Sequence, residues 1–284
     1  MMKKVFLVNL LLFFSICLSQ NKEPYAIFDA NGKKQNYNKL LQKSLDVQVV
    51  LFGEFHDNSI IHWLQIEIAK DVFARKPLIL GAEMMEADSQ NFYNQYLDGQ
   101  FSYKKLDSLV KLWPNFKTDY KPLLDFAKAN KIKFVATNIP RRFASLVFKK
   151  DLPSLETLSL EEKSWIAPLP IAFDLELPGY KSMLGMQGGH AGDKMPKAQA
   201  IKDATMAHFI EKNLLSNSVF LHFNGTYHSE NFEGINWYLK KQMPDIKILT
   251  IATVVQKEIK TLEKENLGKA DFIIVVDQDA TKTY

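Results

Sequence analysis

The chain has 284 residues, of which 46% are hydrophobic and 12% aromatic, enough to build a substantial core in one or two domains. The 36 basic and 32 acidic residues give a formal charge of +4 and form no block of like charge, so nucleic acid is not an expected partner. The sequence has no GxGxxG, P-loop, GxSxG or HExxH motif, so it lacks the signatures of nucleotide-binding proteins, serine hydrolases and familiar zinc proteases.

The first 19 residues, MMKKVFLVNLLLFFSICLS, are typical of a secretory signal. Lys3 and Lys4 precede an apolar run from Val5 to Leu18, which is shorter than the roughly 20 apolar residues of a membrane-spanning helix. Cleavage after Ser19 would leave residues 20–284 as an exported protein of the periplasm or cell envelope. Its formal charge would be +2, because Lys3 and Lys4 are removed.

Cys17, the only cysteine, allows a second interpretation. If it were the lipid-attachment residue of a lipoprotein, cleavage would precede it and the lipid would anchor the protein to a membrane. The preceding residues Phe14, Ser15 and Ile16 fit poorly with the small residue normally found just ahead of a lipidated cysteine, so we favour soluble export. The mature protein would then contain no cysteine and would fold without disulfides.

Six apolar runs indicate strands, at 47–53, 77–84, 132–138, 218–225, 246–254 and 271–276. Between them lies sequence with helical spacing, and helices are expected at about 59–75, from about residue 88, after Pro140, at 197–212 and at about 230–242. Apolar strands that alternate with amphipathic helices predict an α/β fold with a mostly parallel sheet flanked by helices.

Two stretches interrupt this alternation. Residues 88–118 are helical and rich in Tyr, Phe and Gln, whereas residues 150–195 are punctuated by prolines and glycines. We interpret both as helical insertions that form a small helical subdomain on a single α/β domain of residues 20–284.

Polar side chains follow several of the expected strands where they end. Glu54 and His56 follow the first strand, Glu83 and Asn138 end the next two, and His228 follows the fourth, in the sequence NGTYH. Because the carboxyl ends of parallel strands meet at one edge, and ligands bind in the crevice outside it, we predict a site there.

The pattern Gly-x-x-His follows two of these strands, as GEFH (53–56) and GTYH (225–228). Glu54 and His56 are two residues apart, so both side chains point to one side of an extended segment. Asp57 or Asn58 is instead expected to cap the next helix. Imidazole and carboxylate groups suit a divalent transition metal such as Zn or Mn, or general acid–base catalysis. The predicted metal ligands or catalytic residues are therefore Glu54, His56, Glu83 and His228.

Several motifs occur in order from about residue 47 onward: GEFHDNSIIHWLQ, GAEMMEADSQ, WPNFKTDYKPLLDFAKANKIKFVATNIPRR, KAQAIKDATMAHFI and FNGTYH. Together they resemble the ChaN family of haem-binding proteins of bacterial iron uptake, within the wider Tiki/TraB superfamily. The resemblance implies a parallel-sheet α/β domain with a small helical subdomain. It also implies haem in a cleft that two protomers of a homodimer could share, with a tyrosine on the iron.

A porphyrin needs an apolar slot, an axial ligand and cations near its propionates. Arg141 and Arg142 are the expected propionate partners. In the segment LPGYKSMLGMQGGH, Tyr180 and His190 are the candidate axial ligands, and Tyr227 is a further candidate. The helix at 197–212 carries Gln199 and Asp203 one turn apart, which are expected either to orient a rim histidine or to lie on the helix surface.

Three functions remain open. The first, which we favour, is a haem-binding and non-enzymatic protein of iron acquisition, and it rests on the family resemblance. The second is a metal-dependent hydrolase similar to Tiki proteases and erythromycin esterases, with His56, His228 and the glutamates Glu54 and Glu83 at its centre. The third is a periplasmic binding module for another ligand.

Overall fold

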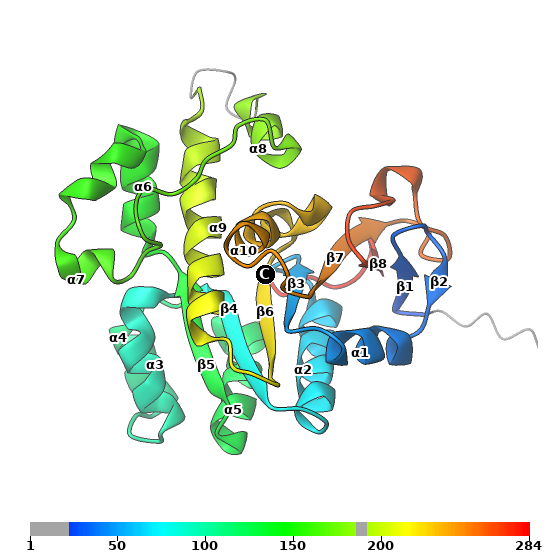
Figure 1. The fold of residues 1–284 in the computed structure, drawn as a ribbon. Helices are drawn as coiled ribbons and strands as arrows, with labels where there is room; N and C mark the ends of the chain where they lie inside the picture. Colours follow the sequence, from blue (N-terminus) through cyan, green and yellow to red (C-terminus); the bar gives the residue numbers. More distant parts are fainter. Residues whose placement is uncertain (1–22, 186–191) are drawn as a thin grey trace, which may run out of the picture.

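The computed structural model describes residues 23–185 and 192–284. An eight-stranded sheet runs through the molecule in the order β2-β1-β8-β7-β3-β6-β4-β5, with helices on both faces (Figure 1). This is the α/β fold that the sequence predicts, and all six expected strands are present. The strands are β1 (Tyr25–Asp29), β2 (Lys34–Gln35), β3 (Val49–Glu54), β4 (Leu78–Glu86), β5 (Lys133–Asn138), β6 (Val219–Gly225), β7 (Ile248–Gln256) and β8 (Phe272–Asp277).

Strands β3 to β8 pair in parallel with one another, whereas β1 pairs antiparallel with both β8 and β2. Strands β1 and β2 were not predicted from the sequence. Strand β2 has two residues and β1 has five, too few for a periodicity to stand out. The pairing of β1 with β8 brings the beginning and the end of the described chain side by side.

Ten α-helices flank the sheet in the described residues: α1 (Tyr37–Leu45), α2 (Ser59–Phe73), α3 (Gln90–Leu97), α4 (Tyr103–Leu109), α5 (Lys121–Asn130), α6 (Arg141–Lys150), α7 (Leu160–Lys163), α8 (Pro178–Ser182), α9 (Lys194–Asn213) and α10 (Ile235–Gln242). Helices α1, α2 and α5 pack on one face and α9 and α10 on the other. Along β3, Val50 and Phe52 join the first of these cores and Val49 and Leu51 the second, because successive side chains of a strand point to opposite faces.

The turn from β3 into α2 is fixed by a capping residue. Oδ1 of Asn58 accepts hydrogen bonds from the backbone N–H groups of Ile60 and Ile61, each at 3.1 Å. Asp57 pairs instead with Lys282, at 2.7 Å between its carboxylate and the ammonium. The segment that carries Glu54 and His56 is therefore held at both ends, by β3 and by the cap of α2.

The two expected insertions contribute helices at separate places along the flank of the sheet (Figure 1). Residues 88–118 contain α3 and α4, and residues 150–195 contain α7 and α8. Figure 1 draws α3 and α4 near one end of α9 and α8 near the other. The domain boundaries that we assign from the sequence stay a prediction.

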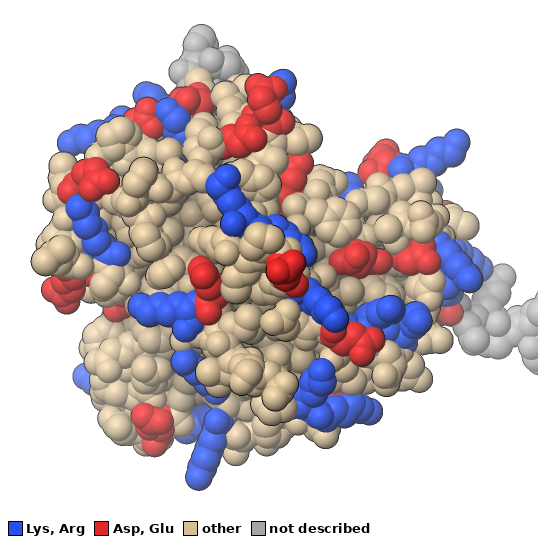
Figure 2. Space-filling model, in the orientation of Figure 1, with Lys and Arg blue, Asp and Glu red and all other residues tan. Residues whose placement is uncertain are grey.

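None of the helices in the two described ranges is long and apolar enough to cross a membrane. The expected signal segment 1–19 and Cys17 lie outside those ranges. Figure 2 shows acidic and basic side chains interspersed over the face turned to the viewer, which fits the nearly balanced charge of the sequence.

Candidate functional site

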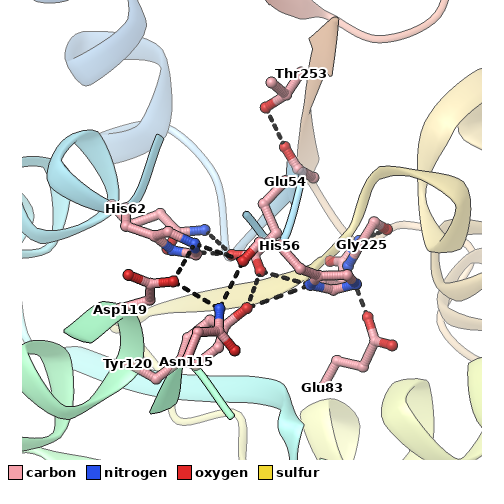
Figure 3. Close-up of polar contacts among 12 residues, drawn as sticks. Glu54, His56, His62, Glu83, Asn115, Asp119, Tyr120, Gly225 and Thr253 are labelled. Carbon is pink, nitrogen blue, oxygen red and sulfur yellow. Dashed lines mark hydrogen bonds and ion pairs between the residues drawn. The ribbon is translucent and has the colours of Figure 1, made fainter. Parts of the chain in front are cut away.

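The predicted rim residues meet at the carboxyl ends of three adjacent strands. Strands β3, β6 and β4 are neighbours in the sheet, and Glu54 ends β3 while Glu83 lies near the end of β4. His228 follows β6 in a short helical turn. Figure 3 shows Glu54, His56, Glu83 and Gly225 converging on one point. The structure thus brings Glu54, His56, Glu83 and His228 together, although up to 174 positions separate them in sequence.

Glu54 and His56 form the first pair of this cluster. The carboxylate Oε1 of Glu54 lies 2.8 Å from Nδ1 of His56, and the hydroxyl of Tyr120 donates to the same oxygen at 2.6 Å. The other carboxylate oxygen accepts a hydrogen bond from the amide of Gln65. Burial alone would raise the pKa of Glu54, but His56, the nearby His62 and the hydroxyl of Tyr120 lower it. Glu54 is therefore a buried carboxylate that fixes the ring of His56.

The imidazole of His56 remains partly accessible, with 29% of its side chain exposed. Burial lowers its pKa, but the hydrogen bond to Glu54 and the charge of Glu83 outweigh burial and raise the pKa above its ordinary value. Because Nδ1 is bound to Glu54, Nε2 is the nitrogen that faces Gly225. A Cβ atom at Gly225 would lie 2.9 Å from this Nε2 and 3.4 Å from Oε2 of Glu83. A glycine at 225 thus lets the two pairs approach each other.

Glu83 and His228 form the second pair. Oε1 of Glu83 lies 3.1 Å from Nε2 of His228, and Oε2 accepts the backbone N–H of Gly225 at 2.7 Å. Nδ1 of His228 contacts the carboxylate of Asp203. Burial lowers the pKa of His228, but the two carboxylates raise it to about 9. His228 is therefore a buried imidazolium held between two acidic groups.

Residues of α8 and α9 complete the surroundings of His228. The amide nitrogen of Gln199 lies 3.0 Å from Nδ1 of His228, and Asp203 contacts the same nitrogen. Of the two roles expected for Gln199 and Asp203, orienting a rim histidine or lying on the helix surface, these contacts fit the first. The hydroxyl of Tyr180 donates to Asp203 at 2.7 Å, and the Tyr180 side chain is buried. As an axial ligand, Tyr180 would have to give up this hydrogen bond.

A second set of side chains holds the loop that follows β3. The amide of Asn115 donates to the carbonyl of His56 at 2.7 Å and to Asp119 at 2.6 Å. His62 contacts the same carbonyl through Nε2, at 3.1 Å (Figure 3). The hydroxyl of Thr283 donates to Asp119 at 2.7 Å, so the tail after β8 takes part in this network.

A cleft of about 530 Å³ opens beside Glu83. Leu112, Trp113, Pro114 and Ile139 form its apolar part, and the edge of the Trp113 ring packs on His56 with 4.7 Å between ring centroids. Its charged lining consists of the cations Lys111, Arg141 and Lys202 and the acids Glu83 and Glu86. A larger hollow of about 620 Å³ lies at the opposite end of β5 and contains none of the predicted site residues.

The structure separates the two expected propionate partners. Arg141 lines the cleft, whereas Arg142 is exposed, pairs with Asp88 and lies over the ring of Trp165 at 5.4 Å. Asn138, also predicted at the rim, lines the cleft and donates to the carbonyl of Glu83 at 2.9 Å. His190 lies outside the described residues.

The expected Zn or Mn site is not found within residues 23–185 and 192–284, where no group of three or more His, Cys, Asp or Glu side chains is arranged to hold a metal ion. His56 and His228 each contact a carboxylate through a ring nitrogen, Nδ1 in both cases. Histidine–carboxylate pairs of this kind can serve general acid–base catalysis.

Sequence reasoning did not identify the contributions of the segment WPNFKTDY. Trp113 forms part of the cleft wall, Asn115 and Asp119 hold the loop, and Tyr120 binds Glu54. These residues follow an insertion and do not end a strand, so the strand-end argument could not find them. A signal was present, because the motif belongs to the sequence that carries the family resemblance.

Residues 40–239, more than two thirds of the chain, match the family described as haem-binding uptake, Tiki superfamily, ChaN. A curated relative, protein RETICULATA-RELATED 5, chloroplastic, of Arabidopsis thaliana, is 27% identical over 162 residues. That match covers 53% of this chain and 20% of the plant protein, so the chain spans about a fifth of the relative.

Solved structures of distant sequence share the fold. ChaN of Campylobacter jejuni, in a structure described as cofacial haem binding, has a TM-score of 0.68 at 17% identity and covers 90% of this chain and 98% of its own. An erythromycin esterase in its open conformation has a TM-score of 0.52 at 10% identity, and the match covers 91% of this chain and 98% of the esterase chain. A Bacillus cereus protein has a TM-score of 0.50 at 12% identity, and the match covers 88% of this chain and 93% of the Bacillus chain. The family match over residues 40–239 assigns this chain to the ChaN family of haem-binding uptake proteins in the Tiki superfamily.

Proposed function

We propose that this chain is an exported haem-binding protein of bacterial haem and iron acquisition, and that haem enters the cleft beside Glu83. Membership of the ChaN family supports haem as the ligand. The observation that carries the choice of cleft is the combination of an apolar wall with three cations in one hollow of about 530 Å³. Haem has the matching chemistry, because it is a flat apolar ring that carries two anionic propionates.

The residues of the cleft fit this ligand. The aromatic face and edge of Trp113, with Leu112 and Pro114, offer apolar contact to a porphyrin, and Arg141 and Lys202 offer charge-assisted hydrogen bonds to propionates. His56 adjoins the same wall and is partly exposed, so it joins Tyr180 and His190 as a candidate axial ligand.

Location and assembly belong to the same proposal. After cleavage at Ser19 the protein would be soluble in the periplasm or cell envelope, and two copies could share the haem as a homodimer. Mass spectrometry of the N-terminus of the exported protein distinguishes a chain that begins at Gln20 from one that begins with a lipidated Cys17. Light scattering with and without hemin measures the number of copies.

Hemin titration followed at the Soret band tests haem binding, and the chain supplies a matched pair of variants. Arg141→Ala is expected to weaken binding about tenfold, which corresponds to the loss of one charge-assisted contact. Arg142→Ala should leave binding unchanged, because Arg142 pairs with Asp88 and does not line the cleft. The axial ligand is identified by the Soret spectra of His56→Ala, Tyr180→Phe and His190→Ala. Absence of a stoichiometric Soret shift in the unsubstituted protein would reject the proposal.

Hydrolysis is a second candidate function, favoured by one specific observation. Two histidine–carboxylate pairs meet across Gly225, with His56 and Glu83 both within 3.4 Å of the position of a Cβ at that residue. Such pairs are typical of general acid–base catalysis. Measurement of bound Zn and Mn in the purified protein distinguishes a metal-dependent hydrolase, the version predicted from the sequence, from acid–base catalysis without metal.

A further inference from the structure

We propose that the edge of the sheet opposite the Glu83 cleft docks on a membrane that contains anionic phospholipid. The edge is formed by the last turns of α1, α2, α5, α9 and α10 and by the connections that lead from them into β3 to β7. These segments, named the amino edge below, are residues 42–48, 70–77, 127–132, 210–218 and 239–247. The inference goes beyond haem binding and does not depend on it.

Backbone hydrogen bonds show that the connections of the amino edge lie side by side. The N–H of Gln48 donates to the carbonyl of Lys247 at 3.0 Å, and the N–H of Phe220 donates to the carbonyl of Gln48 at 2.8 Å. The N–H of Val219 donates to the carbonyl of Pro77 at 2.9 Å, and β5 lies next to β4 in the sheet. Segments from distant parts of the sequence therefore form one continuous surface.

Positive charge that is scattered in the sequence gathers on the amino edge. Its five segments contain ten basic and four acidic residues, a formal charge of +6, whereas the whole chain carries +4. One of the acids, Asp71, is already paired with Arg75 at 3.1 Å. Cations in a last turn offset the helix dipole, but Lys76, Lys131 and Lys247 lie beyond the last residue of the preceding helix. Figure 2 shows Lys and Arg side chains projecting from the lower end of the molecule, where Figure 1 draws the ends of α2 and α5.

Two apolar side chains project from the same edge. Leu215, in the turn between α9 and β6, is 59% exposed, and Phe73, the last residue of α2, is 38% exposed. Cations beside exposed apolar side chains are typical of proteins that lie on membranes, because the cations meet the headgroups while the apolar groups enter the acyl boundary. An anionic bilayer offers negative charge and an apolar layer together, which is why we choose it over an acidic protein surface.

The hollow of about 620 Å³ at the start of β5 lies on this edge and suits a lipid headgroup. Its lining includes three cations, Lys128, Lys131 and Lys133, and one acid, Asp98. Leu97 adds an apolar wall beside them. The phosphate of a headgroup can form charge-assisted hydrogen bonds with ammonium groups, so this hollow offers a defined contact within a largely electrostatic surface.

Docking through the amino edge leaves the candidate site accessible. Helix α9 reaches from one edge of the sheet to the other, since Asp203 contacts His228 and the helix ends at Asn213, just before Leu215. At 1.5 Å per residue, about 15 Å of helix separates the two positions. A protein that rests on a membrane through Leu215 therefore turns the Glu83 cleft toward water.

The test uses the chain from Gln20 onward, because residues 1–19 would bind lipid by themselves and every described residue is retained. Flotation with vesicles of equal parts phosphatidylglycerol and phosphatidylcholine, and with phosphatidylcholine alone, measures the partition coefficient. We expect binding only to the anionic vesicles, in about 50 mM NaCl, and its loss in about 500 mM NaCl, because salt screens exposed charges. The double variant Lys131→Glu, Lys133→Glu should lower the partition coefficient by about 30-fold, because two attractions become repulsions.

The chain offers a matched control for this charge change. The double variant Lys149→Glu, Lys150→Glu alters the net charge equally, but at the other end of α9, where the neighbouring Asp151 pairs with Lys197 at 2.7 Å. It should change the partition coefficient by less than about threefold. Leu215→Ser keeps the charge and should lower the partition coefficient about tenfold, through the loss of a buried apolar side chain. Circular dichroism and thermal unfolding check that each variant folds.

Three results would overturn the proposal. The first is no binding to the anionic vesicles at low salt. The second is an equal loss in the two double variants, which would mean that net charge decides and the amino edge does not. The third is binding to soluble poly-glutamate without binding to vesicles, which would indicate an acidic protein partner. Hemin titration of the Lys131→Glu, Lys133→Glu variant should match that of the unsubstituted chain, so failure of membrane docking and failure of haem binding are distinguished.

Discussion

Nε2 of His228 lies 3.1 Å from Oε1 of Glu83, with only 7% of either side chain exposed. Asp203 contacts the other ring nitrogen, so a positive imidazolium lies between two carboxylates in the interior. Burial opposes this charge, yet the acidic neighbours raise the pKa of His228 to about 9. The pair therefore couples the charge state of the site to the stability of the fold.

The first prediction concerns the dependence of stability on pH. The pKa of His228 is about 9 in the folded protein and 6.5 for a free imidazole, so its stabilising contribution is fully present below 6.5 and is lost as the pH rises through 9. The free energy of unfolding should fall by about 3 kcal/mol over this range relative to His228→Gln. Urea denaturation at several pH values measures it. His208→Gln, which removes a half-buried histidine outside the cluster, is the control. Parallel curves for the native chain and His228→Gln would contradict the prediction.

The second prediction is that Glu83→Ala strongly destabilises the protein. Removal of one partner leaves the charge of His228 buried and only partly compensated, which typically costs about 3–5 kcal/mol. Asp88→Ala breaks the pair with the exposed Arg142 and should cost less than about 1 kcal/mol. Urea midpoints of the two variants give the comparison. Similar midpoints would show that the Glu83–His228 pair is not desolvated in solution.

The third prediction contrasts two glycines of the site. A Cβ at Gly225 would meet Nε2 of the His56 side chain at 2.9 Å, so Gly225→Ala should keep the fold but displace the ring. A Cβ at Gly53 would meet the backbone oxygen of Ile251 at 2.8 Å, which cannot move aside, so Gly53→Ala should lower stability by about 1–3 kcal/mol. Thermal unfolding and the NMR shift of the His56 ring separate the two effects. A large loss of stability in Gly225→Ala would contradict this contrast.

The fourth prediction concerns Tyr120. Its hydroxyl donates to the buried Glu54 at 2.6 Å, so Tyr120→Phe removes a hydrogen bond from a buried carboxylate and should cost about 1–3 kcal/mol. Loss of this donor should also raise the pKa of Glu54. Tyr96→Phe is the matched control, since Tyr96 donates to Asp125, whose side chain is 43% exposed, whereas that of Glu54 is fully buried. Equal costs for both variants would indicate that the Glu54 carboxylate is reached by water.

Sequence reasoning predicted the sheet well, because parallel strands buried on both faces are continuous apolar runs. VVLFGE in β3 and FIIVVD in β8 are examples, and every residue of β3 is buried. It failed for β1 and β2, which are short and antiparallel at the edge. Strand β1 pairs with β8, more than 230 residues later, and no local pattern encodes such a distant contact. Strand β2 has only two residues, too few to show a periodicity.

The candidate site was predicted in part. Strand ends identified Glu54, His56, Glu83 and His228, since topology alone brings such positions to one edge. Their mutual pairing was not predictable, because the choice between metal ligands and acid–base pairs depends on ångström-scale distances. It was also not predictable that Arg141 lines the cleft while Arg142 pairs with Asp88, because this depends on the direction in which each side chain leaves the first turn of α6.

The tail after β8 has a consequence for how the protein is made. Lys282 forms an isolated antiparallel β-bridge with Asn58, and the N–H of Thr283 donates to the carbonyl of Asp57 at 2.9 Å. The Thr283 hydroxyl donates to the carboxylate of Asp119. The loop that carries His56 therefore receives its last contacts from residues that the ribosome adds more than 220 positions later. During synthesis at roughly 5–20 residues per second, these contacts are missing from the loop for on the order of ten seconds or longer. Throughout that interval a nascent chain can hold a partly formed sheet whose edge at the candidate site is still incomplete.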